Sequence, residues 1–263
     1  MAFNSQREVI ALIPAAGKAS RLPLLPFSKE LYPIGYNSHS FYPKVISQFL
    51  LENMRAADIK RAYIILRKGK WDIPAYFGDG KMLDMNLAYL LMDLPYGVPY
   101  TLDQAYPFVQ NAIIALGFPY IFFHPGNAFV RLLARQNETN ADIVLGIFPT
   151  THPHKTDMVD IDDNGRIRSI QIKPVKTHLT YTWQIAVWTP AFTRFMHDYI
   201  SVQQSIFENN MNVKELFVGD VIQTAMKNNI EIDTVIFKDG NCLDIGTPED
   251  LLKAVQTISK IVI

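Results

Sequence analysis

The stretch LIPAAGKASRLPLLPFSKELYPIG combines small residues and cations in an order that suits phosphate binding. Ala15, Ala16 and Gly17 follow an apolar run, and small residues there let backbone N–H groups approach a phosphate closely. Arg21 can hold phosphate oxygens through two parallel hydrogen bonds, and Lys29 adds a compact positive charge. A rigid surface loop with solvated cations explains the same residues equally well, so the stretch alone leaves both interpretations open.

Two further segments contain residue types that bind metal ions. DIDD, residues 160–163, has an Asp-x-Asp pattern, but it leads directly into Asn164 and Gly165, a pair typical of hairpin turns. HPH, residues 152–154, supplies two histidines but lacks the further ligands expected of a zinc site. We therefore interpret the first segment as a turn and the second as a loop.

The elements that must position these residues alternate between strands and helices in the first half of the chain. Continuous apolar runs predict buried strands over residues 9–14, 62–67, 87–92, 112–116 and 142–148. Helical spacing occurs over residues 43–57, with Pro43 in the first turn, and over residues 101–109 and 128–136. This alternation predicts an α/β fold with a doubly wound, mostly parallel sheet.

The second half has a different pattern. DMVDIDDNGRIRSIQIK alternates apolar and polar residues around Asn164 and Gly165, which predicts a β-hairpin. Strands are expected over residues 181–188 and 231–237, and helices over residues 190–207 and 213–228. Thr247 is a suitable N-cap for a last helix, with Pro248 at its first position and Asp250 closing a capping box. Since no Pro/Ser/Gly-rich linker interrupts the chain, we expect one domain over residues 1–263.

Composition excludes several classes of function. The 263 residues are 49% hydrophobic, enough for one large core, and 25 basic residues balance 25 acidic ones. We therefore expect no nucleic-acid partner, and no apolar run approaches the roughly 20 residues that would span a membrane. The N-terminus lacks the features of a signal peptide, and the single Cys242 excludes an internal disulfide, so we expect a cytoplasmic protein. Whether the chain forms a homo-oligomer stays open.

Three motifs in order resemble the sugar-1-phosphate nucleotidyltransferases, in particular the glucose-1-phosphate thymidylyltransferases and uridylyltransferases. PAAGKASRL and SKELYPIG match the two ends of that family's signature loop. IKPVK resembles its Glu-Lys-Pro segment, and LDIGTPEDLLKA resembles its late Asp-Gly-Thr motif. The resemblance covers residues 9–254 and implies a Rossmann-like fold of the nucleotide-diphospho-sugar transferase type. It also implies a nucleotide-binding half over about residues 8–150 and a sugar-phosphate-binding half over about residues 151–263.

The resemblance implies condensation of a nucleoside triphosphate (UTP, dTTP or CTP) with a sugar-1-phosphate, and release of pyrophosphate. Arg21 and Lys29 would be the catalytic cations. The nucleotide would be bound by Ala15, Ala16, Gly17, Lys18, Met92 and Gly97. Lys173 would hold the sugar phosphate, and Trp183 would line the sugar pocket. Asp244 would be one of two aspartates that bind Mg²⁺.

Several positions depart from the family pattern. Tyr120 stands where the second metal-binding aspartate is expected, which predicts a degenerate metal site. Met92 stands near the position of a base-reading Gln, and Ile172 replaces the Glu of Glu-Lys-Pro. A catalytically impaired homologue, which binds nucleotides or sugar nucleotides in a regulatory role, is therefore the alternative function.

Two other functions fit less well. A dinucleotide-dependent oxidoreductase would require a Gly-x-Gly-x-x-Gly loop after the first strand, and the chain has none there. A glycosyltransferase would share the fold but use a sugar nucleotide, whereas Lys29 and Lys173 favour an enzyme that makes one.

Overall fold

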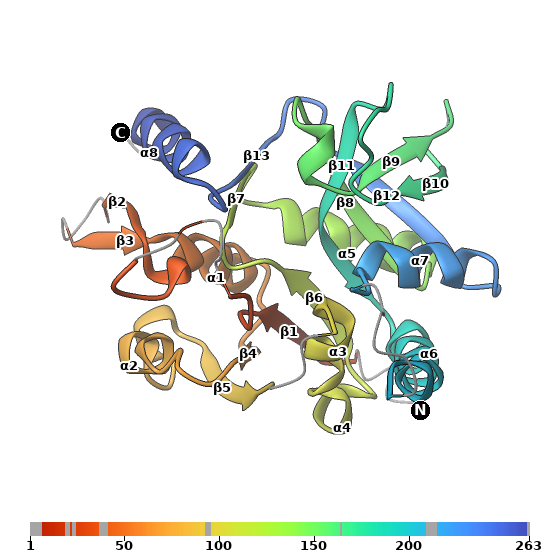
Figure 1. Ribbon diagram of the computed structural model, residues 1–263, viewed down its shortest axis with the longest axis horizontal. Helices are drawn as coiled ribbons and strands as arrows, with labels where there is room; N and C mark the ends of the chain where they lie inside the picture. The colour runs from red at the N-terminus through yellow and green to blue at the C-terminus, as the bar shows by residue number, and fades with distance from the viewer. Residues whose placement is uncertain are drawn as a thin grey trace, which may run out of the picture.

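The structure is a computed structural model that describes residues 7–18, 22, 25–36, 42–92, 96–163, 165–208 and 215–261 (Figure 1). Its strands are β1 (Val9–Pro14), β2 (Pro33–Tyr36), β3 (Pro43–Val45), β4 (Arg61–Leu66), β5 (Asn86–Leu91), β6 (Ile113–Gly117), β7 (Ile121–His124), β8 (Ile143–Pro149), β9 (Met158–Ile161), β10 (Ile167–Gln171), β11 (Tyr181–Trp188), β12 (Ile232–Ile236) and β13 (Asn241–Asp244). Its helices are α1 (Ile46–Ala56), α2 (Asp72–Phe77), α3 (Val98–Asp103), α4 (Tyr106–Val109), α5 (Ala128–Thr139), α6 (Pro190–Glu208), α7 (Val218–Met226) and α8 (Pro248–Ile261). Short 3₁₀ turns are η1 (Lys29–Leu31), η2 (Lys81–Leu83) and η3 (Pro153–Lys155).

A 9-stranded sheet forms the centre of the molecule, in the order β10-β9-β11-β6-β1-β4-β5, with β8 pairing β11 and β12. β1 is parallel to both β4 and β6, and β4 is parallel to β5. β11 runs antiparallel to β6 and β8, and so makes the sheet mixed. The expected doubly wound, mostly parallel α/β fold is confirmed.

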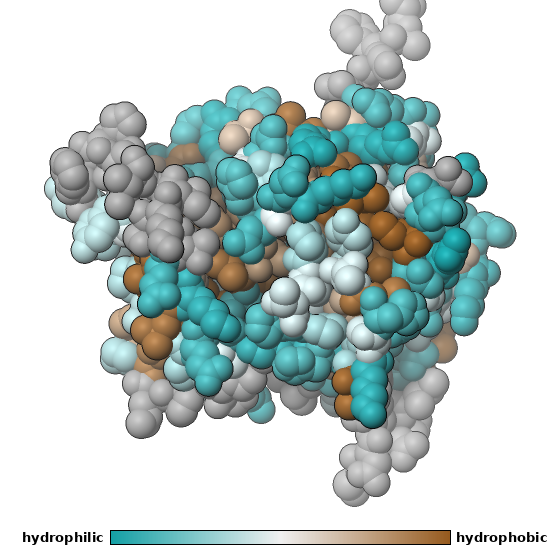
Figure 2. Space-filling view, turned by 90° about the horizontal axis from the view of Figure 1, so that it is seen from above, coloured by the Kyte–Doolittle hydropathy of each residue, from teal (hydrophilic) through white to brown (hydrophobic). Residues whose placement is uncertain are grey.

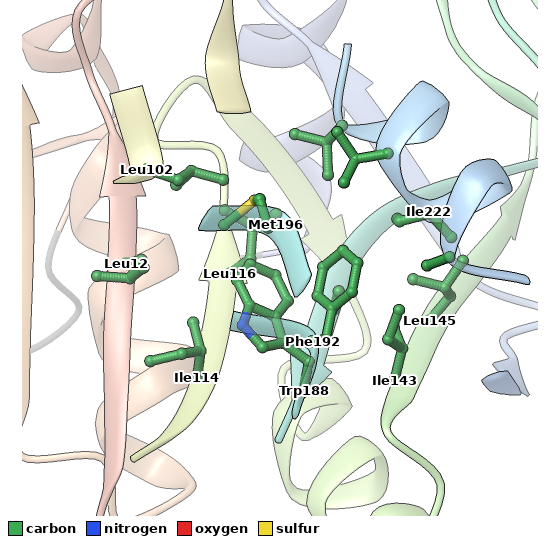
Figure 3. Packing of buried hydrophobic residues seen from close by; sticks show 14 of the residues in the cluster. Leu12, Leu102, Ile114, Leu116, Ile143, Leu145, Trp188, Phe192, Met196 and Ile222 are labelled. Carbon is green, nitrogen blue, oxygen red and sulfur yellow. The ribbon is translucent and has the colours of Figure 1, made fainter. Parts of the chain in front are cut away.

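Helices cover both faces of the sheet because the strand residues alternate in direction. Along β1, Ile10 and Leu12 join a core cluster with residues of α3, α6 and α7. Ala11 and Ile13 join a second cluster with residues of α1, α2 and α5. Figure 3 shows the first cluster, in which Trp188 of β11 lies among side chains of the strands and of α6. Within the described residues, none of the helices is both long enough and apolar enough to cross a membrane.

Two helix predictions were wrong at their starts. Residues 43–45 form β3, which pairs with β2 in a two-stranded sheet, and α1 begins at Ile46 rather than at Pro43. Pro has no N–H for a sheet and is tolerated on such a strand. The predicted helix over residues 213–228 begins at Val218, because Leu216 instead pairs with Gly97 in an isolated bridge.

The remaining predictions concern one helix of the first half, the β-hairpin and the cap of the last helix. The helix over residues 101–109 is split into α3 and α4, and Pro107 near the start of α4 explains the break, since it lacks an N–H to continue α3. The hairpin of β9 and β10 is confirmed, but its turn residue Asn164 lies outside the described residues. Thr247 caps α8 as expected, with the Asp250 N–H donating to Thr247 Oγ1 at 3.2 Å. The Asp250 carboxylate accepts from the Thr247 hydroxyl at 2.6 Å, and the bonds among the described residues do not include the Thr247 backbone N–H that would complete the predicted capping box.

Candidate active site

A cavity of about 440 Å³ opens at the carboxyl ends of β1 and β6. β1 lies between β4 and β6 in the sheet, so the connections after β1 lead to opposite sides of this strand. Such a reversal of strand order is a topological switch point, where α/β sheets commonly bind ligands. We call one part of the wall the Lys29 side, formed by Gly17, Lys18, Lys29, Tyr120 and Asp244. We call another part the Lys173 side, formed by Asp157, Lys173, Trp183 and Phe217. Seen from above, apolar and hydrophilic residues intermingle on the surface (Figure 2).

Lys29 is the most buried cation of the cavity wall, with only 7% of its surface exposed. Its Nζ lies 3.2 Å from the centroid of the Tyr120 ring, a distance at which the aromatic face attracts an ammonium group. Because η1 is a single turn, the position of Lys29 depends on what holds its two neighbours in the chain.

Both neighbours of Lys29 are anchored from outside the loop. The Ser28 hydroxyl donates to Asp72 Oδ1 at 2.7 Å. Lys70 Nζ donates to both carboxylate oxygens of Glu30, at 2.8 and 2.9 Å, and this ion pair is buried. Ser47 Oγ donates to the Glu30 carbonyl at 2.6 Å. The sequence predicted Lys29 but not these supporting residues, because ion pairs distant in the chain have no local pattern.

Tyr120 and Asp244 lie close together where β7 pairs with β13. β7 and β13 pair antiparallel with Asp244 opposite Ile121, and the Ile245 N–H donates to the Tyr120 carbonyl at 3.1 Å. Mg²⁺ prefers carboxylate, carbonyl and water oxygens, and it often relies on one protein carboxylate together with substrate phosphates. In the part of the chain that the structure describes, no three His, Cys, Asp or Glu side chains cluster to hold a metal ion. Asp244 is thus a single carboxylate of the cavity wall that is compatible with a metal ion shared with substrate phosphates.

Lys173 follows the β9–β10 hairpin and has a left-handed backbone with φ of 39°. Its Nζ lies 3.9 Å from the centroid of the Phe217 ring, but in contrast to Lys29 the residue is exposed. Ile172, before it, packs against the core cluster that includes α7. Trp183 of β11 lines the cavity and is 4% exposed, so both residues predicted for the sugar pocket lie on the Lys173 side.

Asp157 is a wall residue that the sequence analysis missed. Burial raises the pKa of its carboxyl to about 6, although the Lys173 ammonium, the Lys173 backbone N–H and the Trp183 side chain act in the opposite direction. It lies directly before β9, among several acidic residues of the same segment, and no spacing distinguishes it from them.

The C-terminal part of the chain closes another part of the wall. Lys155 of η3 donates to Asp250 of α8 at 2.8 Å, which joins two elements distant in the sequence. Burial raises the pKa of Asp250, but the hydrogen bonds from Lys155 and Thr247 outweigh this effect and hold the pKa below its ordinary value. Burial also raises the pKa of Cys242 to about 12, so this thiol stays protonated at neutral pH and is a poor nucleophile.

The other residues predicted to bind nucleotide are dispersed. Gly17 and Lys18 are exposed and line the cavity, with the half-buried Ala16 before them. Ala15 is buried, and its N–H donates to the Ile65 carbonyl at 2.8 Å, so this N–H is already used within the protein. Arg21 lies outside the described residues.

Met92 and Gly97 were predicted near the base. Met92 is 3% exposed, belongs to the hydrophobic core, and is not among the described residues of the cavity wall. Gly97 has φ of 116°, and a Cβ there would lie 2.1 Å from the Leu216 carbonyl oxygen. This glycine lets the turn before α3 pack on the segment that carries Phe217.

Comparisons with known proteins agree with this fold. The nucleotidyl transferase family model matches residues 10–261. The fold is similar to that of a putative glucose-1-phosphate thymidylyltransferase from Bacillus anthracis in complex with a sucrose, with a TM-score of 0.78 and 18% identity over 95% of this chain and 94% of that one. It is also similar to a UDP-glucose pyrophosphorylase complexed with UDP-glucose, with a TM-score of 0.77 and 16% identity over 97% and 99% of the two chains. No curated protein matched the sequence. Because the family model spans almost the whole chain, the chain belongs to the nucleotidyl transferase family.

Proposed function

We propose that this protein condenses a nucleoside triphosphate with a sugar-1-phosphate to give a nucleotide-sugar and pyrophosphate. The observation that carries the proposal is that Lys29 and Lys173 line the same cavity, each with its ammonium over an aromatic ring. The reaction brings two anionic phosphates together, and one cation for each would offset their repulsion. In this proposal the nucleotide-binding half is about residues 8–150, and the sugar-phosphate-binding half is about residues 151–263.

The chemistry needs alignment and charge neutralisation rather than a covalent intermediate. A sugar-phosphate oxygen attacks the α-phosphorus, a new P–O bond forms, and the bond to the bridging oxygen of pyrophosphate breaks. Lys29 holds the α-phosphate, and Arg21 holds the triphosphate and stabilises the leaving pyrophosphate. Lys173 orients the attacking phosphate. The anchored neighbours of Lys29 support this assignment, since a fixed cation needs little reorganisation during the reaction.

Mg²⁺ belongs to the proposal as a cofactor that is shared with the triphosphate. Asp244 would be its protein carboxylate, beside Tyr120, and the remaining ligands would be phosphate oxygens and water. When bound, the ion neutralises charge on the phosphates. We propose UTP, dTTP or CTP as the triphosphate.

A pyrophosphate-release assay with Mg²⁺, each nucleoside triphosphate and a panel of sugar-1-phosphates tests the function. We expect release from at least one pair, and we expect Lys173→Gln to raise the KM for the sugar phosphate by about 10- to 100-fold. Lys176→Gln is the matched control, because Lys176 is exposed on the same connection and is not among the described residues of the cavity wall. Clear triphosphate binding without pyrophosphate from any pair would contradict the proposal.

A second function, binding without turnover, is favoured by Tyr120 beside Asp244. Tyr120→Asp would restore a carboxylate at the expected metal position. A large gain in activity over a nearly inactive wild type would support an impaired homologue. An active wild type and an unchanged variant would remove this second function.

A further inference from the structure

Two buried polar atoms on the Lys173 side lack partners. Asp157 Oδ1 and Trp183 Nε1 are both buried, and within the described residues neither has a hydrogen-bond partner at normal geometry, although the indole N–H lies near enough to the Asp157 carboxyl to lower its pKa. Both side chains line the cavity. Buried polar atoms are rarely left in this state, because each costs on the order of 1–3 kcal/mol. One is an acceptor and the other a donor, so together they indicate a missing ligand group of both kinds.

The two atoms belong to one small region next to Lys173. The Trp183 side chain and the Lys173 backbone N–H both act to stabilise the ionised Asp157, which requires that they lie close to its carboxyl. The same ammonium that lies over Phe217 also attracts this carboxylate. A group bound by Asp157 and Trp183 would therefore be close to a phosphate held by Lys173.

Hydrogen bonds from the surrounding chain hold the backbone of Asp157 in place. Thr182 Oγ1 donates to the Asp157 carbonyl at 2.8 Å, and Gln184 Nε2 donates to Thr182 Oγ1 at 3.2 Å. Gly219, in the first turn of α7, leaves room for the carboxyl, since a Cβ there would lie 2.7 Å from Asp157 Oδ2. The Asp157 carboxyl therefore lies against the N-terminal turn of α7, and the helix dipole favours a negative charge at that end.

A hydroxyl group is both a donor and an acceptor and satisfies both atoms at once. Resting on the proposed function, we infer that one hydroxyl of the sugar phosphate bridges Asp157 and Trp183, donating to Oδ1 and accepting from the indole N–H. Asp157 and Trp183 are then specificity residues for sugar phosphates with a free hydroxyl near the phosphate. Analogues in which this hydroxyl is removed or methylated are rejected, because they leave buried polar groups unpaired.

Calorimetry on the full chain tests this inference without turnover. The probes are glucose, galactose and mannose 1-phosphates and the monodeoxy analogues of the best binder, with a triphosphate analogue whose α–β bridge cannot be cleaved. We expect one deoxy analogue to bind wild type about 10- to 100-fold more weakly than its parent. Asp157→Asn should abolish that difference, and Trp183→Phe, which keeps the apolar ring, should reduce it about 2- to 10-fold. Asp160→Asn on β9 is the control, because Asp160 is not among the described residues of the cavity wall.

The outcomes separate this inference from the proposed function. If wild type binds the sugar phosphates selectively and Asp157→Asn removes this selectivity, the inference is supported. This holds even if no pyrophosphate is released, because the absence of release would contradict only the proposed transfer reaction. Pyrophosphate release together with unchanged selectivity in Asp157→Asn overturns the inference and leaves the transfer intact. No binding of any sugar phosphate in the panel also overturns it. Circular dichroism of each variant confirms that a loss of binding is not a loss of fold.

Discussion

The Lys29 side and the Lys173 side use the same pair of chemical groups in opposite surroundings. Each has an ammonium over an aromatic ring, Tyr120 in one case and Phe217 in the other. Lys29 is buried, and both of its chain neighbours are fixed by hydrogen bonds to residues distant in the chain. Lys173 is exposed and follows a hairpin.

The difference suggests how the two sides divide their roles. On the Lys29 side, Ser28 and Glu30, the neighbours of the cation in the chain, are paired within the protein, so the cation is held in place before a substrate arrives. On the Lys173 side, Asp157 and Trp183 have buried polar atoms with no hydrogen-bond partner at normal geometry among the described residues. We infer that the Lys29 side neutralises phosphate charge and that the Lys173 side selects the sugar phosphate. Four substitutions test this contrast.

The largest expected effect is on stability, from breaking the buried ion pair behind Lys29. Glu30→Gln leaves the Lys70 ammonium buried without its partner, and we expect a loss of about 3–5 kcal/mol in the free energy of unfolding. Replacing Lys70 by Met as well removes the uncompensated charge and should recover part of this loss. Urea denaturation of the two single variants and the double variant measures this. Additive losses would show that the pair does not act as a unit.

The next effect is on turnover, from removing the fixed cation itself. Lys29→Ala should lower kcat/KM by about 100- to 1000-fold, because a preorganised charge next to the reacting phosphate is lost. Lys68→Ala, an exposed lysine of the same charge type, should leave the rate unchanged. Steady-state pyrophosphate release measures both. Equal rates for wild type and Lys29→Ala would contradict a catalytic role of the fixed Lys29 ammonium.

The third effect concerns pH and is confined to the Lys173 side. The Asp157 pKa rises from 3.8 to about 6 on folding, so the folded state binds more protons than the unfolded state between these values. The free energy of unfolding must therefore fall as pH rises through this window. Asp157→Asn should remove this fall and stabilise the protein at pH 7 by on the order of 2–3 kcal/mol.

Urea denaturation from pH 4 to pH 7 measures the Asp157 effect, with Asp160→Asn as the control that should keep the wild-type slope. A stabilised variant that has lost selectivity would mean that the Lys173 side sacrifices stability for function. A variant no more stable than wild type at neutral pH would contradict the burial of an ionised Asp157.

The sequence predicted the fold better than it predicted the site. Strands such as β1 and β11 could be predicted because their apolar runs are local patterns. Lys29, Lys173 and Asp244 line one cavity, and they could be singled out because their motifs are contiguous. Asp157 was missed since its burial depends on a hairpin folding onto α7. Met92 was placed at the base by its position in a motif, whereas its apolar side chain packs in the core.

Register irregularities were equally invisible in the sequence. Strict alternation would place Trp183 and Trp188 on opposite faces of β11. A register shift between Trp183 and Ile185 instead brings both indoles into the same core cluster, and so turns Trp183 toward the cavity. Such a bulge depends on the pairing with β8, which no local pattern encodes.

The smallest effect is expected at the bridge that joins η3 to α8 across the cavity wall. Lys155→Met removes the pair with Asp250, which is only partly buried, so we expect a loss of at most about 1 kcal/mol. The loss should shrink as salt is raised, because screening weakens the pair in wild type and has nothing to weaken in the variant. Thermal denaturation at low and high salt measures it, with Lys253→Met on the same cavity wall as the control. A loss as large as that of Glu30→Gln would mean that this wall is as preorganised as the Lys29 side.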